Sequence, residues 1–236
     1  MNIWPFFKEH GKTHPVFTEN DEYFRDIDQN RPVAEFDYVV FDTELTGLNR
    51  RHDFIISIGA VKIRNLKILP GETFHTYVHP PHNNPTDSTL IHRITPQQLE
   101  QAPHISQVLP EFLQFCGPSL LVGHYVDMDV TFVNKAARKL FYSKINNPCI
   151  DTLRLAQVYT ETTWENYLDR FNYQVSYNLA DLCSEYNLPA FSSHDALQDA
   201  LQTAYLFIYL VKQLERHDYT TLKDLFNAGK SWRWYL

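Results

Sequence analysis

The chain has 236 residues, of which 44% are hydrophobic and 14% aromatic, so it can bury a substantial core and global disorder is excluded. Its formal net charge of −7 argues against a protein that coats nucleic acid through a polybasic surface. The charge balance still permits a site that grips a few nucleotides through bound cations.

Cysteine usage and the absence of a targeting pattern predict a cytoplasmic protein. Three cysteines without a CxxC pair argue against a zinc knuckle or a disulfide scaffold. The start, MNIWPFFKEHGK, lacks the pattern of a secretory signal, and the longest apolar run, at 204–211, is too short to span a bilayer. We therefore expect no membrane partner.

Three strands are predicted in the first part of the chain. Residues 38–41 and 55–63 are rich in β-branched and aromatic residues, with a glycine turn signal between them. Residues 73–78 alternate and end at a proline-rich loop, as a third strand would. The aromatic-rich residues 1–35 have no clear period and are interpreted as an N-terminal extension.

Helices alternate with short strands in the rest of the chain. Thr95 is placed to cap a short helix, and SLLVGH (119–124) and CIDTLRLAQVY (149–159) each begin as a strand that leads into a helix. An apolar stripe predicts a long helix near the end: Leu197, Leu201, Ala204, Ile208 and Val211. These elements predict one α/β domain over 36–216 and a tail, 217–236, that packs on it.

Two carboxylates follow the first predicted strand. Residues two apart on a strand point the same way, about 6.5 to 7 Å apart, so Asp42 and Glu44 project from one face and Thr43 from the other. Binding sites in open α/β sheets gather beyond the carboxyl ends of strands. The pair can share a cation there, although a lone D-x-E is more often a pair of surface acids.

A second pair of acids lies where the strand at 119–124 gives way to a helix. An acid at a helix start caps backbone amides and complements the helix dipole without any catalytic role. We assign the cap to Asp127, which leaves Asp129 for chemistry.

The segment SSHDALQDA adds a histidine and a further acid. Ser192 and Asp195 resemble a capping box, so a helix is predicted to begin there, with Asp199 in its second turn. His194 and Asp199 would lie roughly 140° apart on a regular helix. His194 must therefore act from a less regular lead-in if it shares a site with Asp199.

Clustered carboxylates need compensation. Two unit charges 4 Å apart interact with about 4 kcal/mol at an effective dielectric constant of 20. Either some of the acids stay protonated or divalent ions bind, and oxygen-only ligands favour magnesium or manganese over zinc.

The order and spacing of seven blocks resemble the DEDDh 3′–5′ exonucleases, the DnaQ-like group that includes the proofreading subunit of bacterial DNA polymerase III. The blocks are FDTELTGL, IISIGAVKI, IHRIT, LVGHYVDMDVTF, IDTLRLA, YNLADLCSEYNLP and HDALQDA. The resemblance spans roughly 36–215. It implies an RNase H-like fold, with a mixed five-stranded sheet whose second strand is antiparallel and which helices flank.

The resemblance also implies a mechanism. It makes His194 the general base and gives two Mg²⁺ or Mn²⁺ ions four ligands: Asp42, Glu44, Asp129 and Asp199. The implied reaction is hydrolysis at the 3′ end of single-stranded DNA or short RNA, with release of nucleoside 5′-monophosphates. A histidine with a pKa of about 6.5 suits proton removal near neutral pH.

Substrate contacts are implied for two further segments. The IHRIT block resembles the family segment that contacts the terminal nucleotide, which implicates His92 and Asp87 before it. Leu45, Thr46 and Gly47 would lie against the terminal sugar and base. The alternative for His92 is an ordinary loop histidine.

The chain departs from the family pattern at three positions. The usual D-T-E-T-T-G has Leu45 in place of a threonine, and the usual H-N-x-x-F-D has Tyr125 and Met128 at the Asn and Phe positions. These departures affect substrate contact, whereas all five catalytic positions are kept.

Basic and aromatic side chains offer contacts for a polyanion. Three cations can line one side of the helix after Asp129, namely Lys135, Arg138 and Lys139, and Arg50 and Arg51 follow the first acidic motif. The alternative is a solvated face. Trp232 and Trp234 either stack bases or pack on the core. No clamp-binding peptide is recognisable, so the sequence gives no support for a DNA polymerase partner.

Two other functions fit parts of the pattern. A non-catalytic module of the same fold would bind a partner or nucleic acid through residues 1–35, but such modules often lose an acid and none is missing here. A metal phosphohydrolase of the HD type would need His52, His194 and His217 together on an all-helical core.

Overall fold

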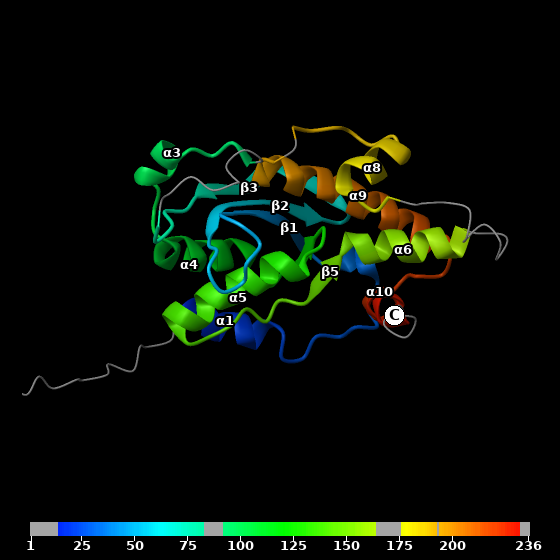
Figure 1. Ribbon diagram of the computed structural model, residues 1–236. Coiled ribbons are helices and arrows are strands. Elements are labelled where there is room, and N and C mark those ends of the chain that lie inside the picture. Colours follow the sequence, from blue (N-terminus) through cyan, green and yellow to red (C-terminus); the bar gives the residue numbers. More distant parts are fainter. Residues whose placement is uncertain (1–13, 83–91, 164–175, 193, 232–236) are drawn as a thin grey trace, which may run out of the picture.

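The computed structural model describes residues 14–82, 92–163, 176–192 and 194–231. Five strands form one sheet in the order β3-β2-β1-β4-β5 (Figure 1). Their bounds are β1 Tyr38–Leu45, β2 Ile55–Arg64, β3 Lys67–Tyr77, β4 Leu120–Gly123 and β5 Cys149–Asp151. Because β2 is antiparallel to β1 and β3 while β4 and β5 continue in parallel, the predicted mixed sheet is confirmed.

Helices cover both faces of the sheet (Figure 1). In one layer α6 and α8 pack against α9, and α10 packs against α6: α9 Ala196–Glu215, α6 Thr152–Thr163, α8 Leu179–Glu185 and α10 Leu222–Ser231. The opposite layer consists of α1 Pro15–Tyr23, α4 Ile105–Cys116 and α5 Asp127–Phe141. Two short helices complete the set, namely η1 Val33–Glu35 and α3 Pro96–Glu100. The sheet is thus enclosed between two helical layers.

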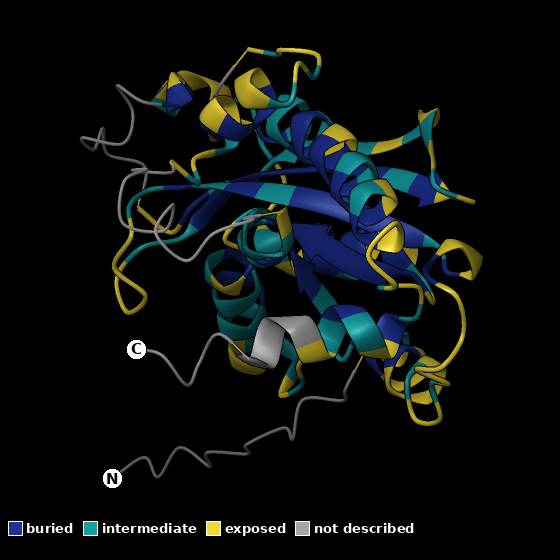
Figure 2. Ribbon diagram, turned by 90° about the vertical axis from the view of Figure 1, so that its right-hand side faces the viewer, coloured by how far each residue is buried: buried dark blue, intermediate teal, exposed yellow. Residues whose placement is uncertain are grey.

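Strand β1 divides the core into two halves. Its even-numbered residues Tyr38 and Val40 belong to the cluster under α9, and its odd-numbered residues Val39 and Phe41 belong to the cluster under α4 and α5. Figure 2 shows the buried strands as dark blue ribbons between the helices. Because side chains alternate along a strand, the even-numbered acids that follow belong to the α9 side of the sheet.

The sequence reading is wrong at several boundaries. It does not anticipate α1, which begins at Pro15 with the His14 ring accepting a hydrogen bond from the Val16 amide, nor α10. Strand β3 begins at 67 rather than 73, because Asn65 and Leu66, both at positive φ, close a tight hairpin with β2. None of the described helices is long and apolar enough to cross a membrane.

The α3 cap follows the prediction. Thr95 accepts from the Gln98 amide, the Gln98 side chain returns to the Thr95 amide, and Pro96 occupies the first helical position. The division into 1–35, 36–216 and 217–236 stays a prediction.

Candidate active site

Three acids meet at the carboxyl end of β1. Asp42 and Glu44 lie on that strand and Asp199 lies in the first turn of α9, and each offers a carboxylate oxygen, all within 4.8 Å of one another. Oxygen-only donors at this spacing fit a hard divalent cation. The structure therefore brings together three of the four predicted metal ligands in one group.

A glycine lets α9 reach these acids. Gly59 pairs with Asp42 across β1 and β2. A Cβ atom on Gly59 would lie 2.1 Å from the Leu197 amide nitrogen and 2.2 Å from the Ala196 carbonyl carbon, so any side chain would collide with the start of α9. Gly59 is not among the residues predicted for the site, although a glycine inside an apolar strand indicates close approach of another backbone.

The lead-in to α9 holds the candidate base. His194 has φ 68°, and its amide donates to Asp199 Oδ2 at 2.9 Å. Asp195 is the N-cap, since its carboxylate accepts from the Gln198 amide at 3.0 Å. The helix therefore begins after Asp195 rather than at Ser192, and Asp199 lies in its first turn. His194 occupies the irregular lead-in that its spacing from Asp199 requires.

The fourth predicted ligand, Asp129, lies on α5 and is hydrogen-bonded to Thr43, which stands between Asp42 and Glu44 on β1. Asp129, in the first turn of α5, is buried and accepts two hydrogen bonds from Thr43, one from the amide at 3.0 Å and one from the hydroxyl at 2.5 Å. Thr43 therefore turns to the α5 side while Asp42 and Glu44 turn to the α9 side. This bond fixes α5 against the strand at the level of the acids.

The cap predicted for Asp127 is wrong. Helix α5 has Val126 at its N-cap with no side-chain hydrogen bond, and Asp127 is exposed, 3.5 Å from Arg154. A carboxylate from β5 orders the turn instead. Asp151 accepts from the Tyr125 amide at 3.0 Å and from the Leu153 amide at 3.0 Å. Sequence reasoning missed Asp151 because this contact joins two different strand ends.

The four acids hold their protons unusually tightly. Burial, followed by the charges of Asp129, Asp199 and Glu44, raises the pKa of Asp42 well above its usual range. Burial and the neighbouring charges raise the pKa of Glu44 to about 7.

The same forces act on the acids that the helices contribute. Burial raises the pKa of Asp129 to about 7 even though the Thr43 hydrogen bonds oppose it. Burial also raises the pKa of Asp199, against the opposing hydrogen bond from His194. The negative charge of Asp195 also contributes to the raised pKa of Asp42. A divalent cation would relieve the repulsion that these groups share.

His92 presents a buried donor near the candidate base. Its side chain is buried, and its Nδ1 accepts from the Ile94 amide at 3.0 Å, which leaves the proton on Nε2. Nε2 has no hydrogen-bond partner among the described residues. Burial, followed by the charge of nearby His194, lowers the pKa of His92, so the ring is neutral at pH 7. A neutral, unsatisfied N–H suits contact with a phosphate or sugar oxygen.

The other predicted substrate contacts are mostly engaged within the protein. Leu45 is buried on the α5 side, the Thr46 hydroxyl donates to Asp53, and Gly47 packs against the same Asp53 carboxylate. Their contact with substrate stays a prediction, and Asp87 lies outside the described residues. At the departures from the family pattern, Tyr125 has φ 59° and is half-exposed.

The basic residues of α5 do not share one side, contrary to the prediction. Lys135 and Lys139 line a pocket beside the start of β2, whereas Arg138 faces α1 in a separate pocket. The Lys135 ammonium is bonded to backbone carbonyl groups. Trp232 and Trp234 lie outside the described residues.

The histidines of the HD-type alternative do not meet. His194 precedes α9 and His217 follows it, so roughly 30 Å of helix separates them. His52 lies in the exposed turn between β1 and β2. The five-stranded sheet also contradicts the all-helical core that this alternative needs.

Comparisons with known proteins agree with the predicted family and fold. A family model described as Exonuclease, RNase_T, matches residues 39–207. The DNA polymerase III PolC-type of Caldanaerobacter subterraneus subsp. tengcongensis is 36% identical over 187 residues, which cover 79% of this chain and 12% of that protein. The corresponding protein of Thermotoga maritima is 30% identical over 231 residues, which cover 94% of this chain and 16% of that protein. The chain thus spans under a fifth of these relatives.

Solved structures share the fold at low sequence identity. E. coli Exonuclease I in complex with a dT13 oligonucleotide has a TM-score of 0.65 at 19% identity, with 78% of this chain and 43% of that chain covered. The nuclease domain of 3′hExo, a DEDDh family member bound to rAMP, has a TM-score of 0.63 at 16% identity, with 77% of this chain and 94% of that chain covered. These structures share the fold, and the family model with the curated relatives confirms the resemblance found in the sequence: the chain belongs to the RNase_T exonuclease family.

Proposed function

We propose that this protein is a metal-dependent 3′–5′ exonuclease that removes nucleotides from the 3′ end of single-stranded DNA. The observation that carries the proposal is the group formed by Asp42, Glu44 and Asp199, whose carboxylate oxygens lie within 4.8 Å of one another. Two further observations support it: the pKa values of all four acids are raised, and the His194 amide is hydrogen-bonded to Asp199, which keeps the proposed base beside the proposed cation ligands.

The proposed step is hydrolysis of the last phosphodiester bond. His194 takes a proton from the attacking water, the water oxygen bonds to phosphorus, and the bond from phosphorus to the 3′ oxygen of the preceding nucleotide breaks. The leaving 3′ oxygen takes up a proton, and a nucleoside 5′-monophosphate departs. When bound, a pair of divalent cations held by the four acids would supply an activated nucleophile and stabilise the charge on the leaving oxygen.

The protein's own groups would position the substrate for this step. We expect the Nε2–H of His92 to donate to the terminal nucleotide, because this group has no hydrogen-bond partner among the described residues and burial lowers the pKa of the ring. His194 is exposed and stands at positive φ outside α9, which leaves its ring accessible from the solvent side. Asp129 holds α5 on Thr43, so the site keeps its shape without substrate.

DNA is the preferred substrate in this proposal for two reasons. The curated relatives are named as DNA polymerases, and one neighbouring structure holds a dT13 oligonucleotide. Short RNA remains the second candidate, since another neighbour is bound to rAMP. The same relatives make a DNA polymerase the natural partner to test by co-purification.

The decisive experiment follows a 3′-labelled oligonucleotide with Mg²⁺ or Mn²⁺. We expect the wild type to release nucleoside 5′-monophosphates and Asp42→Ala to release none. Asp37→Asn is the matched control. Asp37 directly precedes β1, at the end of the strand away from the site, and forms an ion pair with Arg64. Absence of release by the wild type, or release unchanged in Asp42→Ala, contradicts the proposal and favours the non-catalytic binding module.

A substrate panel then separates the candidate substrates. Single-stranded DNA, duplex DNA, RNA and dinucleotides are compared at equal concentration, with Asp199→Asn as the inactive reference. We expect the highest kcat/KM on single-stranded DNA. A higher value on RNA would replace DNA with RNA in the proposal while leaving the mechanism in place.

A further inference from the structure

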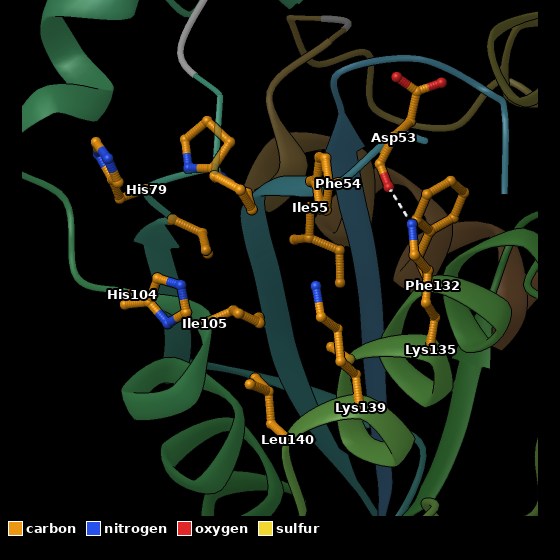
Figure 3. Close-up of a pocket in the computed structure, with 14 residues that line it drawn as sticks. Asp53, Phe54, Ile55, His79, His104, Ile105, Phe132, Lys135, Lys139 and Leu140 are labelled. Atoms are coloured by element: carbon orange, nitrogen blue, oxygen red, sulfur yellow. Dashed lines mark hydrogen bonds between the residues drawn. The ribbon is translucent and has the colours of Figure 1, made fainter. Parts of the chain in front are cut away.

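Lys135 of α5 is bound to the loop that connects β1 to β2. Its ammonium donates to the Asp53 carbonyl oxygen at 2.6 Å and to the Arg51 carbonyl oxygen at 3.2 Å. It also lies over two aromatic rings, 4.7 Å from the Phe54 centroid and 5.6 Å from the Phe132 centroid. Figure 3 shows the side chain rising from α5, with its amine directed at the Asp53 backbone. A lysine with this many contacts is held in place rather than free in solvent.

The loop that Lys135 holds is closed on itself. The Asp53 carboxylate accepts from the Thr46 hydroxyl and from the Asn49 amide, each at 2.8 Å. The Thr46 hydroxyl accepts from the Phe54 amide, and the Thr46 amide donates to the Phe54 carbonyl, each at 3.0 Å. Gly47 leaves the room that the Asp53 carboxylate fills, because a Cβ there would lie 2.5 Å from Asp53 Oδ2. These bonds tie residues 46–54 together into one unit.

This unit begins directly after the acids of β1. The β1–β2 pairing is irregular between Glu44 and Leu45, so the regular ladder does not fix the direction in which the chain leaves the strand. Helix α5 is hydrogen-bonded to the chain on both sides of that irregularity, through Asp129 to Thr43 and through Lys135 to the loop. These two residues of α5 are six positions apart, roughly 9 Å along the helix axis. Two attachment points on one rigid helix fix the orientation of the segment between them.

We propose that Lys135 is a positioning residue for the exonuclease reaction, which sets the β1–β2 loop, and with it the segment from Leu45 to Gly47, relative to the acids. The inference rests on the proposed function. This positioning role differs from binding a phosphate, because the ammonium of Lys135 is already in contact with two carbonyl groups and two aromatic rings.

Lys139 provides a matched control on the same helix. It lies one turn after Lys135, lines the same pocket and carries the same charge (Figure 3). It is exposed, and no hydrogen bond or ion pair from it to another described residue is seen. A lysine that acted only by attracting phosphates would be matched or exceeded by Lys139, whereas a lysine that acts through the loop would not.

The experiment measures kinetics on a single-stranded DNA oligonucleotide for Lys135→Met, Lys135→Arg and Lys139→Met. Methionine keeps an unbranched stem over the rings and removes the donors. We expect Lys135→Met to raise KM about tenfold with kcat changed by less than about twofold, because the loop loses its place while the acids keep theirs. Lys135→Arg should recover most of the loss, and any loss in Lys139→Met should be smaller than that in Lys135→Met and should vanish at high salt.

Two further readouts separate positioning from charge and from folding. We expect the Lys135→Met defect to persist at high salt, since screening weakens only exposed charges. Hydrogen exchange should speed up at the amides of Thr46, His52 and Phe54 in Lys135→Met, with the amides of β1 and β4 unchanged. The exchange measurement needs no activity, so it remains informative for a slow variant.

Three results would overturn the inference. These are equal losses in Lys135→Met and Lys139→Met that vanish at high salt, an unchanged KM, or unchanged exchange in the loop. If Lys135→Met does not fold, Lys135→Gln is carried through the same measurements. Failure of the proposed function is distinct, because then the wild type itself releases no 5′-monophosphate.

Discussion

The carboxylate of Asp42 is surrounded by other acids, and this crowding has a measurable cost in the cation-free protein. Burial and like charges raise the pKa of each of the four acids above its usual range of about 4. A carboxyl group whose pKa is raised on folding binds its proton more tightly in the folded state. Its contribution to stability is present at low pH and is lost as the pH rises through the folded-state pKa.

We expect the thermal stability of the cation-free protein to fall as the pH rises from about 5 to about 8. Glu44 and Asp129, with pKa values of about 7, lose their protons in this interval and then repel their neighbours. Scanning fluorimetry in EDTA should show Tm falling by about 5 °C or more, and Mn²⁺ at pH 8 should restore it.

The control for this prediction is Asp42→Asn, which removes one of the repelling charges. Its Tm in EDTA should depend less on pH, and Mn²⁺ should raise it less. A wild-type profile that is the same with and without Mn²⁺ would contradict a cation site at these acids.

At the scale of elements, the site depends on how closely α9 approaches the sheet. Gly59 lies opposite Asp42 on β2, and its missing side chain makes space for the backbone of Ala196 and Leu197. The first turn of α9 carries Asp199, so the packing of this helix and the geometry of the acids are a single feature.

Gly59→Ala is expected to lower the free energy of unfolding by about 3 kcal/mol, because its Cβ displaces the start of α9. The same displacement carries Asp199 away from Asp42 and Glu44. Urea denaturation measures the first effect, and a smaller rise of Tm on adding Mn²⁺ measures the second.

Gly71→Ala is the reference for that measurement. Gly71 is exposed on β3, and a Cβ there meets no atom within 4 Å. Its change in stability should stay within about 0.5 kcal/mol. Equal effects of the two substitutions would show that α9 does not need the space at Gly59.

The elements also show which parts of the structure a sequence can predict. The two-residue period of β1 predicts that Asp42 and Glu44 share a face, and the spacing of His194 predicts an irregular lead-in; both depend only on local geometry. The antiparallel direction of β2 came from the family resemblance. The hydrogen bonds from Tyr125 to Asp151 and from Lys135 to the loop join segments far apart in the chain. The periodicity of a single strand or helix cannot predict such contacts.

At the scale of the whole molecule, the residues before β1 contribute to the body of the protein. Phe17 of α1 is buried in the core under α4 and α5. Asn20 is also buried, and its side chain donates to Asn147 Oδ1 at 2.5 Å and accepts from the Asn146 amide at 2.7 Å. These bonds hold the segment that leads into β5. The sequence does not predict this docking, because the aromatic residues of 1–35 follow no helical or strand period.

Asn20→Ala should lower the free energy of unfolding by about 1 to 3 kcal/mol, since it leaves the buried side chain of Asn147 and the partly buried amide of Asn146 without this partner. Because α1 lies away from the acids, kcat at 25 °C should change by less than about twofold. Glu19→Ala, at an exposed neighbouring position, should alter stability by less than about 0.5 kcal/mol. A large loss of kcat in folded Asn20→Ala would mean that α1 acts on the reaction.

The distance along the chain between the acids has a consequence for biosynthesis. Asp42 and Glu44 leave the ribosome early with β1, whereas Asp199 follows only with α9, after the rest of the sheet. A partly synthesised chain therefore holds two of the three clustered acids and cannot close the cation site. The three carboxylates can therefore come together only after α9 has left the ribosome and packed on the finished sheet.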